Sequence, residues 1–188
     1  EPREGSSLSN NQINAIAQDN AGTLWIASSD GLNSYNIQTG KFSRFYPQKS
    51  RKGGYNNIKS LLEDENGYLW VGTDLGLLRF NTGAGTFSQY SKYPSGPGYA
   101  IQVLKRDKAG NIWIGSSEKG LYKLQPETGA LNEFIHNRQE PSSIASNLVR
   151  SILIDKGENV WIGGINGGLN LFLEGSGLFQ RFINESSN

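Results

Sequence analysis

The stretch from Asp19 to Leu32 reads D-N-A-G-T-L-W-I-A-S-S-D-G-L, and it occurs four times in the sequence. The other copies are 64–77 (D-E-N-G-Y-L-W-V-G-T-D-L-G-L), 107–121 (D-K-A-G-N-I-W-I-G-S-S-E-K-G-L) and 155–169 (D-K-G-E-N-V-W-I-G-G-I-N-G-G-L). In every copy a Trp follows the Asp by six residues, so the four Trp residues lie 45, 43 and 48 residues apart. Self-similarity at this period indicates a repeat architecture.

Turn residues divide each repeat into four short segments. The first segment ends at the Asp (13–19, 58–64, 101–107 and 149–155) and is too short for a typical helix, so we predict a strand with mixed faces. A hairpin turn follows, because Asp can bond its own backbone two residues on and Gly can adopt a positive φ. In the fourth copy the Gly of this turn stands one place earlier, at Gly157.

The second segment holds the Trp inside three consecutive apolar residues, as in Leu24-Trp25-Ile26. Bulk on both faces predicts a strand that is covered on both sides. A small residue follows in every copy (Ala27, Gly72, Gly115 and Gly163), which permits a neighbouring backbone to approach closely. A third strand is predicted at 32–36, 77–81, 121–125 and 169–173, and a fourth at 42–46, 87–90, 131–135 and 179–183.

Four short antiparallel strands per repeat are typical of a blade of a β-propeller. We therefore predict an all-β fold: a single β-propeller segment over 1–188, built from four four-stranded antiparallel blades at about 8–46, 54–93, 98–136 and 144–184. The longer connections between blades and the turns after the Trp strands should share one end of the ring. Loops of this kind usually carry function.

Four blades leave three ways of closing the ring. They could form a compact four-bladed ring, two chains could complete a larger ring, or the chain could be an open piece of a seven-bladed ring, within the range known for propellers. An open blade exposes a face lined with residues such as Trp25 or Trp161, which invites association. We expect self-association through such exposed blade faces.

The composition excludes several classes of function. The net charge is +1 with scattered Lys and Arg, so no nucleic-acid partner is expected. No run of 18 apolar residues occurs, so a membrane would be reached only through missing parts of a longer chain. The lack of Cys excludes disulfides and thiolate metal sites, and we expect neither metal nor cofactor. The lack of any Met is expected of a processed protein or an excised fragment.

The repeated residues are predicted to be structural. The four Trp residues lie in apolar triplets, which favours a core position over a carbohydrate-stacking surface (Trp25, Trp70, Trp113 and Trp161). The four Asp residues lie at hairpin turns, where bonding to the turn explains them (Asp19, Asp64, Asp107 and Asp155). His136 has no catalytic motif around it, 163–168 leads into a strand rather than a helix, and the acidic cluster 63–65 lacks a paired-carboxylate arrangement. No catalytic residue is therefore predicted.

The loops hold the candidate ligand surface. Aromatic rings stack on sugars, and amides and carboxylates bond hydroxyl groups. The candidates that precede the first strands of the blades are Asn10, Tyr55, Asn56, Tyr99 and Asn147, and those that follow the Trp strands are Asp74, Glu118 and Asn166. They suit a carbohydrate or another polar ligand.

The pattern I-x-x-I-x-x-D-x-x-G-x-L-W-I-G-T-x-x-G-L, followed by an aromatic-rich strand, resembles the two-component regulator propeller repeat. The second copy fits best, with Ile58, Leu61, Asp64 and the run 69–73 in place. The segments Ser-Ser-Leu-Ser-Asn (6–10) and Ser-Ser-Ile-Ala-Ser-Asn (142–147) are similar to the lead-in of this family. The resemblance covers about 6–184.

This resemblance implies the extracytoplasmic sensor region of a bacterial hybrid two-component protein, on the periplasmic or extracellular side of the inner membrane. Ligands in such sensors are commonly oligosaccharides, and a histidine kinase can follow in the longer chain. The expected function is a non-enzymatic ligand-binding or signal-transmitting module. The alternatives are a propeller enzyme of the lyase or glycosidase type, or a purely structural dimerisation module.

Overall fold

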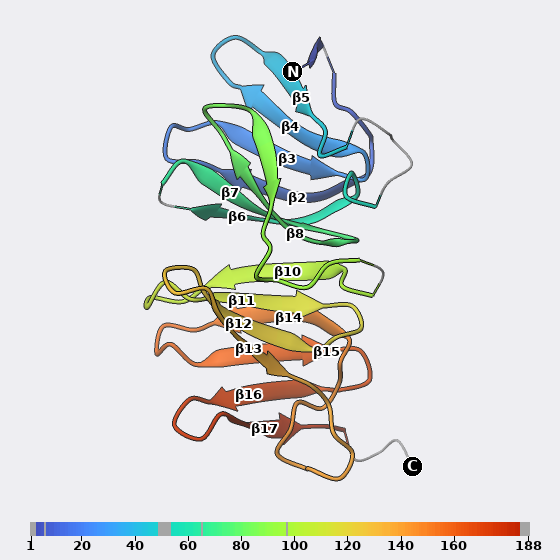
Figure 1. Cartoon of the computed structure of the whole chain (residues 1–188), viewed down its shortest axis with the longest axis vertical. Helices are drawn as coiled ribbons and strands as arrows, with labels where there is room; N and C mark the ends of the chain where they lie inside the picture. The colour runs from blue at the N-terminus through green and yellow to red at the C-terminus, as the bar shows by residue number, and fades with distance from the viewer. Residues whose placement is uncertain (1–2, 6, 49–53, 65, 97, 185–188) are drawn as a thin grey trace. The chain divides into compact units, whose positions relative to one another are not determined.

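The computed structural model describes residues 3–5, 7–48, 54–64, 66–96 and 98–184. These residues form only strands, joined by turns and loops (Figure 1). The chain divides into two compact units, 1–101 and 102–188, and each unit contains two sheets. We call them the N-terminal unit and the C-terminal unit. The described part of the chain contains no helix long and apolar enough to cross a bilayer.

The N-terminal unit holds the first two sheets. The first consists of β1 (Arg3–Gly5), β2 (Ile13–Gln18), β3 (Leu24–Ser28), β4 (Gly31–Asn36) and β5 (Lys41–Phe45), in the order β1-β5-β4-β3-β2. The second consists of β6 (Ile58–Asp64), β7 (Tyr68–Thr73), β8 (Gly76–Asn81) and β9 (Thr86–Gln89) in chain order. The strand β1, which pairs antiparallel with β5, was not predicted by the repeat pattern.

The C-terminal unit holds the other two sheets, both in chain order. The third consists of β10 (Ile101–Arg106), β11 (Ile112–Ser116), β12 (Leu121–Gln125) and β13 (Ala130–Phe134). The fourth consists of β14 (Val149–Ile154), β15 (Val160–Gly164), β16 (Leu169–Leu173) and β17 (Leu178–Phe182). The predicted all-β fold of four four-stranded antiparallel repeats is therefore confirmed, and its first repeat carries one extra strand.

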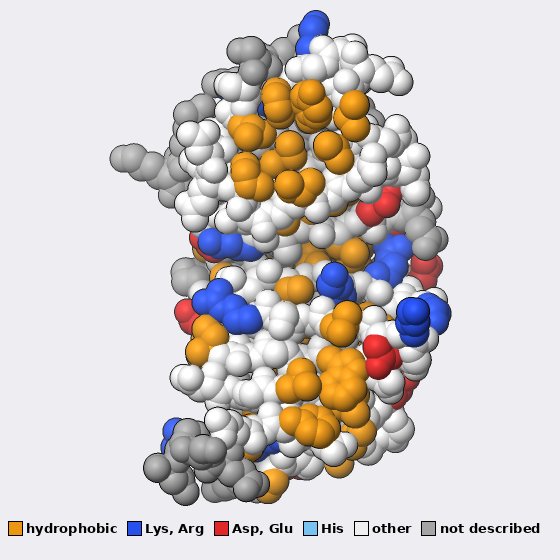
Figure 2. Space-filling view, turned by 180° about the vertical axis from the view of Figure 1, so that it is seen from behind, with side chains coloured by type: hydrophobic (Ala, Val, Ile, Leu, Met, Phe, Trp, Pro, Cys, Tyr) orange, Lys and Arg blue, Asp and Glu red, His pale blue; other side chains and the backbone are white. Residues whose placement is uncertain are grey.

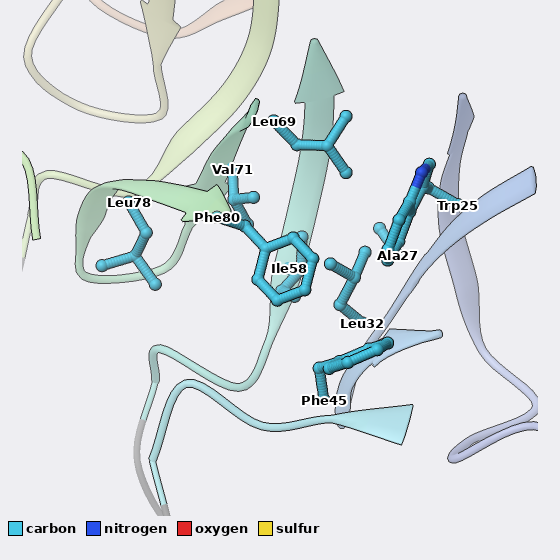
Figure 3. Close-up of a cluster of buried hydrophobic side chains, with 9 residues drawn as sticks. All are labelled: Trp25, Ala27, Leu32, Phe45, Ile58, Leu69, Val71, Leu78 and Phe80. Atoms are coloured by element: carbon cyan, nitrogen blue, oxygen red, sulfur yellow. The ribbon is translucent and has the colours of Figure 1, made fainter. Parts of the chain in front are cut away.

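Within each unit the two sheets pack face to face around the repeated Trp. In the N-terminal unit Trp25 of β3 contacts Phe80 of β8, with ring centroids 5.2 Å apart and an edge-on geometry (Figure 3). In the C-terminal unit Trp113 of β11 contacts Phe172 of β16 in the same way, at 4.9 Å. Each buried ring removes a large apolar area from water, and edge-to-face aromatic pairs add to that gain. The same contact therefore joins two sheets twice in the chain.

The prediction that every Trp strand is covered on both faces is only partly correct. The central residues of β7 and β11 are buried throughout. In β3, however, Leu24 and Ile26 remain half-exposed, and in β15 Trp161 itself is half-exposed. The physical reason is that one face of the first sheet and one face of the fourth are open to solvent.

The first strand of three sheets carries a β-bulge near its beginning. The register shifts between Ile13 and Ala15 in β2, between Ile58 and Ser60 in β6, and between Val149 and Ser151 in β14. The bulged residues are Asn14, Lys59 and Arg150, each directly after the first apolar residue of its repeat. A bulge leaves one residue outside the ladder and redirects its side chain. It also brings the next residue close to the small residue of the Trp strand: a Cβ on Gly163 would lie 2.5 Å from Ser151 Oγ.

Candidate functional site

Each sheet has two ends, which we name by their structural features. The turn end holds the hairpin between the first and second strands, with the repeated Asp. The bulge end is the opposite end, where the first strand begins and the second strand ends. The loops with the eight predicted ligand residues all belong to the bulge ends of their sheets.

At the turn end the Asp carboxylate ties the hairpin to the Trp of the next strand. Asp155 Oδ1 accepts hydrogen bonds from the backbone N–H of Gly157 (2.8 Å) and Asn159 (2.9 Å), and its Oδ2 accepts from Trp161 Nε1 (2.9 Å). Hydrogen bonds from Trp161 and Asn159 lower the pKa of Asp155 to about 2, because they stabilise the charged carboxylate. The same indole bond joins Trp25 to Asp19 (2.7 Å) and Trp113 to Asp107 (3.0 Å).

The second sheet uses its Asp differently. Asp64 Oδ2 accepts from Arg79 Nη2 at 2.7 Å, and the guanidinium also lies 4.0 Å above the ring of Tyr68. Trp70 Nε1 is buried and donates to no described residue. Trp70 is instead packed edge-on against Tyr90, with centroids 4.9 Å apart. Burial raises the pKa of Tyr90, and the nearby positive charge of Arg79 opposes that rise.

The turn of the fourth sheet corrects one detail of the sequence analysis. The residue with positive φ is Glu158, at 63°, and Gly157 does not have a positive φ. Glu158 stands where the first turn has Gly22, so it adopts the conformation that the turn requires. Its carboxylate accepts from the backbone N–H of Lys108 (3.0 Å) and pairs with the Lys108 ammonium (3.0 Å). These contacts, the backbone bond first, hold the pKa of Glu158 below its ordinary value.

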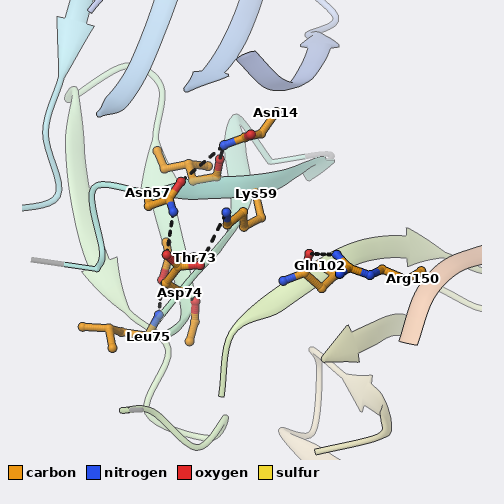
Figure 4. A network of polar contacts seen from close by, with 10 residues as sticks. Asn14, Asn57, Lys59, Thr73, Asp74, Leu75, Gln102 and Arg150 are labelled. Carbon is orange, nitrogen blue, oxygen red and sulfur yellow. Dashed lines mark hydrogen bonds and ion pairs between the residues drawn. The ribbon is translucent and has the colours of Figure 1, made fainter. Parts of the chain in front are cut away.

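At the bulge end of the N-terminal unit, four polar side chains form a network (Figure 4). Asn14 Nδ2 donates to Ile58 O (2.7 Å) and to Asn57 Oδ1 (3.4 Å). Asn57 Nδ2 in turn donates to Asp74 Oδ2 (2.5 Å), and the Lys59 ammonium lies 3.7 Å from Asp74 Oδ1. The network joins the bulged residues of β2 and β6 to the turn between β7 and β8. These two first strands lie side by side.

The bulge end of the C-terminal unit repeats this arrangement in a simpler form. Arg150, the bulged residue of β14, donates through Nη1 to Gln102 Oε1 at 3.1 Å (Figure 4). Gln102 occupies the equivalent position in β10, directly after Ile101. The exposed guanidinium of Arg150 has five N–H donors, so most of its capacity is left for another group.

Several predicted ligand residues are used inside their own loops. Asn10 Oδ1 accepts from the Gln12 N–H (2.7 Å), Asn56 is buried and accepts from the Gln48 N–H (3.0 Å), and Asn147 accepts from the His136 N–H (2.6 Å). His136, which the sequence places in a loop without catalytic partners, contacts Ile144 O through Nδ1 at 2.9 Å. These bonds shape the loops, and the Asn56 side chain uses both of its polar atoms in this way, because its Nδ2 also donates to Gln48 O (3.3 Å).

The other predicted ligand residues differ in their surroundings. Tyr55 is partly buried and packs against the core of the N-terminal unit. The rings of Tyr99 and Tyr93 pack edge-on, with their centroids 6.5 Å apart. Glu118 and Asn166 are exposed in the turns that follow β11 and β15, and Asn166 has a positive φ of 55°. Of the eight residues, Asp74 is the one that the structure places in the polar network, where its partners are Asn57 and Lys59.

Sequence reasoning missed the bulged residues Asn14, Lys59 and Arg150, together with Gln102. A signal was available, because the residue after the first apolar position of each repeat is polar in all four copies. It was overlooked because the first strand was expected to be regular apart from its mixed faces. A bulge is not visible in the apolar spacing, which it leaves unchanged.

A hollow lies at the turn end of the C-terminal unit. This cavity of about 620 Å³ is lined by the two Asp turns and the turn after β16. Its charged groups already have partners: Lys108 pairs with Glu158, and Lys123 pairs with Glu174 at 3.1 Å. Within the described ranges, no three His, Cys, Asp or Glu side chains gather into a group that could hold a metal. We take the bulge end as the candidate site because it holds the network of Asn14, Asn57, Lys59 and Asp74.

Four-stranded antiparallel sheets that repeat along the chain and pack face to face define a β-propeller. Three segments, 7–30, 52–74 and 95–118, match the model of the two component regulator propeller family. The chain therefore carries two-component regulator propeller repeats, and the resemblance seen in its sequence is confirmed. A comparison with curated proteins found no match.

Solved structures of similar fold include two extracellular domains from B. thetaiotaomicron. One belongs to the putative hybrid two component system BT3049 (22% identity, TM-score 0.78, covering 94% of this chain and 25% of that one). The other belongs to the putative one component system BT4673 (26% identity, TM-score 0.74, covering 93% and 22%). This chain thus spans about a quarter of their length. The computationally designed protein Ika4 is also similar (19% identity, TM-score 0.60, covering 88% and 94%).

Proposed function

We propose that this chain is a non-enzymatic sensor module of a bacterial two-component regulator, which acts on the extracytoplasmic side and binds a sugar-like polar ligand at its bulge ends. The propeller repeats and the similarity to extracellular domains of such systems support the class of protein. The observation that carries the binding role is the β-bulge, which turns a polar side chain out of the ladder at one position in three sheets.

The bulge-end network keeps hydrogen-bonding capacity that it does not use internally. Asn14 donates through Nδ2, while its Oδ1 accepts from no described residue. The Lys59 side chain is 25% exposed, and its 3.7 Å ion pair with Asp74 uses one of three N–H donors. A ligand with several hydroxyl groups offers donors and acceptors in the same small space, as this network requires.

The network is also positioned in advance. Asn57 is held by bonds to Asn14 and Asp74, so its amide is fixed before any ligand arrives. A fixed polar group loses little conformational entropy on binding, and this favours affinity. Tyr55, in the loop just before Asn57, packs against the core but stays partly exposed near the same end. Rings and amides together are the groups that recognise carbohydrates.

The test is a calorimetric titration of the full chain with three probes: maltohexaose, xylohexaose and trigalacturonic acid. We expect saturable binding of at least one of them, without turnover. For that probe, Lys59→Ala or Asn14→Ala should raise the dissociation constant at least about tenfold, the equivalent of 1.4 kcal/mol. Lys92→Ala, in an exposed loop, is the matched control and should leave it unchanged.

Three outcomes would contradict the proposal. Equal loss of binding in Lys92→Ala would show that charge in general, and not the bulge end, attracts the probe. Release of shorter sugars during incubation would show that the chain is a propeller enzyme of the lyase or glycosidase type. Absence of binding to all three probes would leave the structural module as the better account.

A further inference from the structure

The fourth sheet exposes an apolar face, which we call the Trp161 face. It consists of Leu153, Trp161, Leu169, Leu171 and Phe182, which neighbour one another through the strand register. Leu153 is 60% exposed and Leu169 is 42% exposed, although the residue equivalent to Leu169 in the first sheet, Leu32, is fully buried. A contiguous face of this kind marks an interaction site, in contrast to scattered apolar residues.

The first sheet exposes an apolar face on the side away from its Trp, and we call it the Ile16 face. It consists of Ile16, Leu24, Ile26, Tyr35 and Phe42, again joined by register. Ile16 is 67% exposed and the other four are half-exposed. The equivalent residues of the fourth sheet are all buried (Ile152, Val160, Ile162, Phe172 and Phe179). Figure 2 shows hydrophobic side chains gathered in one group over the N-terminal unit and in another over the C-terminal unit.

The two faces are the two halves of a contact that the chain makes twice. In the N-terminal unit the Trp25 side of the first sheet packs on the Phe80 side of the second. In the C-terminal unit the Trp113 side of the third sheet packs on the Phe172 side of the fourth. On the Trp161 face, Trp161, Leu169 and Phe182 occupy the repeat positions of Trp25, Leu32 and Phe45 in the first half. On the Ile16 face, Ile16 and Tyr35 occupy the positions of Leu61 and Phe80 in the second half.

We propose that a second copy of this chain covers the Trp161 face with its Ile16 face, head to tail. The occupant follows from the internal contacts, because in both units a Trp-bearing face is covered by the aromatic face of the sheet of the next repeat. The five residues named for each face are uncharged, and Arg44, which register places beside Asn33 on the Ile16 side, already donates to Ser7 O (2.7 Å), so the contact buries no unpaired charge. Because the two surfaces differ, the contact is heterologous: it closes into a ring or continues as an open chain. This proposal does not depend on the proposed function.

The first test measures the mass of the full chain by sedimentation velocity over a range of concentrations. We expect reversible association of the wild type. Leu153→Asp on the Trp161 face and Ile16→Asp on the Ile16 face should each raise the dissociation constant at least about tenfold. Both residues are exposed, so both variants should fold. Ile37→Asp is the matched control, because Ile37 is 59% exposed in the turn after β4 and belongs to neither face.

The second test mixes the two variants and distinguishes a head-to-tail contact from a symmetric one. Each variant retains the face that the other has lost, so the mixture should form a one-to-one pair and nothing larger, while each variant alone stays monomeric. Self-association of Ile16→Asp alone would overturn the proposal in favour of two Trp161 faces in contact. A wild type that is monomeric at every concentration would also overturn it, as would equal loss of association in Ile37→Asp.

Discussion

The two ends of each sheet differ in the identity and in the hydrogen bonding of their repeated polar residue. At the turn end the residue is always Asp, and in three sheets its carboxylate is saturated by backbone and indole N–H groups. At the bulge end the residue changes from sheet to sheet, as Asn14, Lys59, Gln102 and Arg150, and its side chain keeps free donors or acceptors. The difference teaches that a repeated identity serves the fold, whereas a repeated position with varied identity keeps hydrogen-bonding groups that the fold does not use.

The second sheet shows how the turn end tolerates an exception. Arg79 takes the Asp64 carboxylate that an indole takes elsewhere, and Tyr68 supports the guanidinium from below. Trp70 keeps its buried place without the indole bond. The apolar position of the Trp is therefore the stronger requirement, and the indole–carboxylate bond comes second. The comparison predicts that substitutions at the turn end lower stability and that substitutions at the bulge end lower only binding.

The largest effect is expected when the turn-end Trp loses its side chain. Trp113→Ala removes both the packing on Phe172 and the bond to Asp107, and we expect the free energy of unfolding to fall by about 3–5 kcal/mol. Urea denaturation followed by circular dichroism measures it. Trp113→Phe separates the two contributions, because it keeps an aromatic ring in the core. A loss below about 1 kcal/mol for the alanine variant would contradict a structural role.

An intermediate effect is expected in the second sheet. Arg79→Ala leaves the buried Asp64 without its strongest partner, and we expect a loss of about 2 kcal/mol, less than for a fully buried pair because Arg79 is partly exposed. The same denaturation experiment applies, with Arg138→Ala in an exposed loop as the matched control. Equal stability of the two variants would show that Asp64 is satisfied without Arg79.

A smaller effect concerns pH and the fourth sheet. The pKa of Asp155 is lowered to about 2 in the folded chain from an ordinary value of 3.8, so its carboxylate contributes stability above pH 3.8. That contribution is lost as the pH falls through 2, because the protonated acid no longer accepts both sets of bonds. Asp155→Asn should therefore flatten the loss of stability between about pH 4 and 2. Chemical denaturation at several pH values checks this, and Glu127→Gln serves as control.

The smallest effect on stability is expected at the bulge end. Lys59→Ala removes one partly exposed ion pair, whose nitrogen lies 3.7 Å from Asp74, and should change the free energy of unfolding by no more than about 0.5 kcal/mol. The melting temperature measured by calorimetry should stay within about 2 °C of the wild type. A large destabilisation would show that the network belongs to the fold, and the contrast between the two ends would fail.

The sequence was sufficient for the strands and for the Trp positions, because a fixed spacing of apolar residues and turn residues survives in every copy. The sequence was insufficient to predict which hydrogen-bond and ion-pair partners the side chains take. Asp155 and Asp64 have the same spacing to their Trp, but Asp155 accepts a hydrogen bond from the indole and Asp64 pairs with Arg79. Which partner the carboxylate takes depends on residues in another strand, such as Arg79. The loop amides were predicted as ligand groups from their type alone, and Asn56 and Asn147 turn out to bond their own loops.

The most direct test of the contrast between the ends is a map of backbone amide shifts by NMR during titration with the oligosaccharide that binds. We expect the shifted amides to cluster at 14, 57–59 and 74 in the N-terminal unit, or at 102 and 150 in the C-terminal unit. The amides of the Asp turns at 19–23 and 155–159 should remain in place. Shifts concentrated at those turns, with the bulge ends unchanged, would contradict the account.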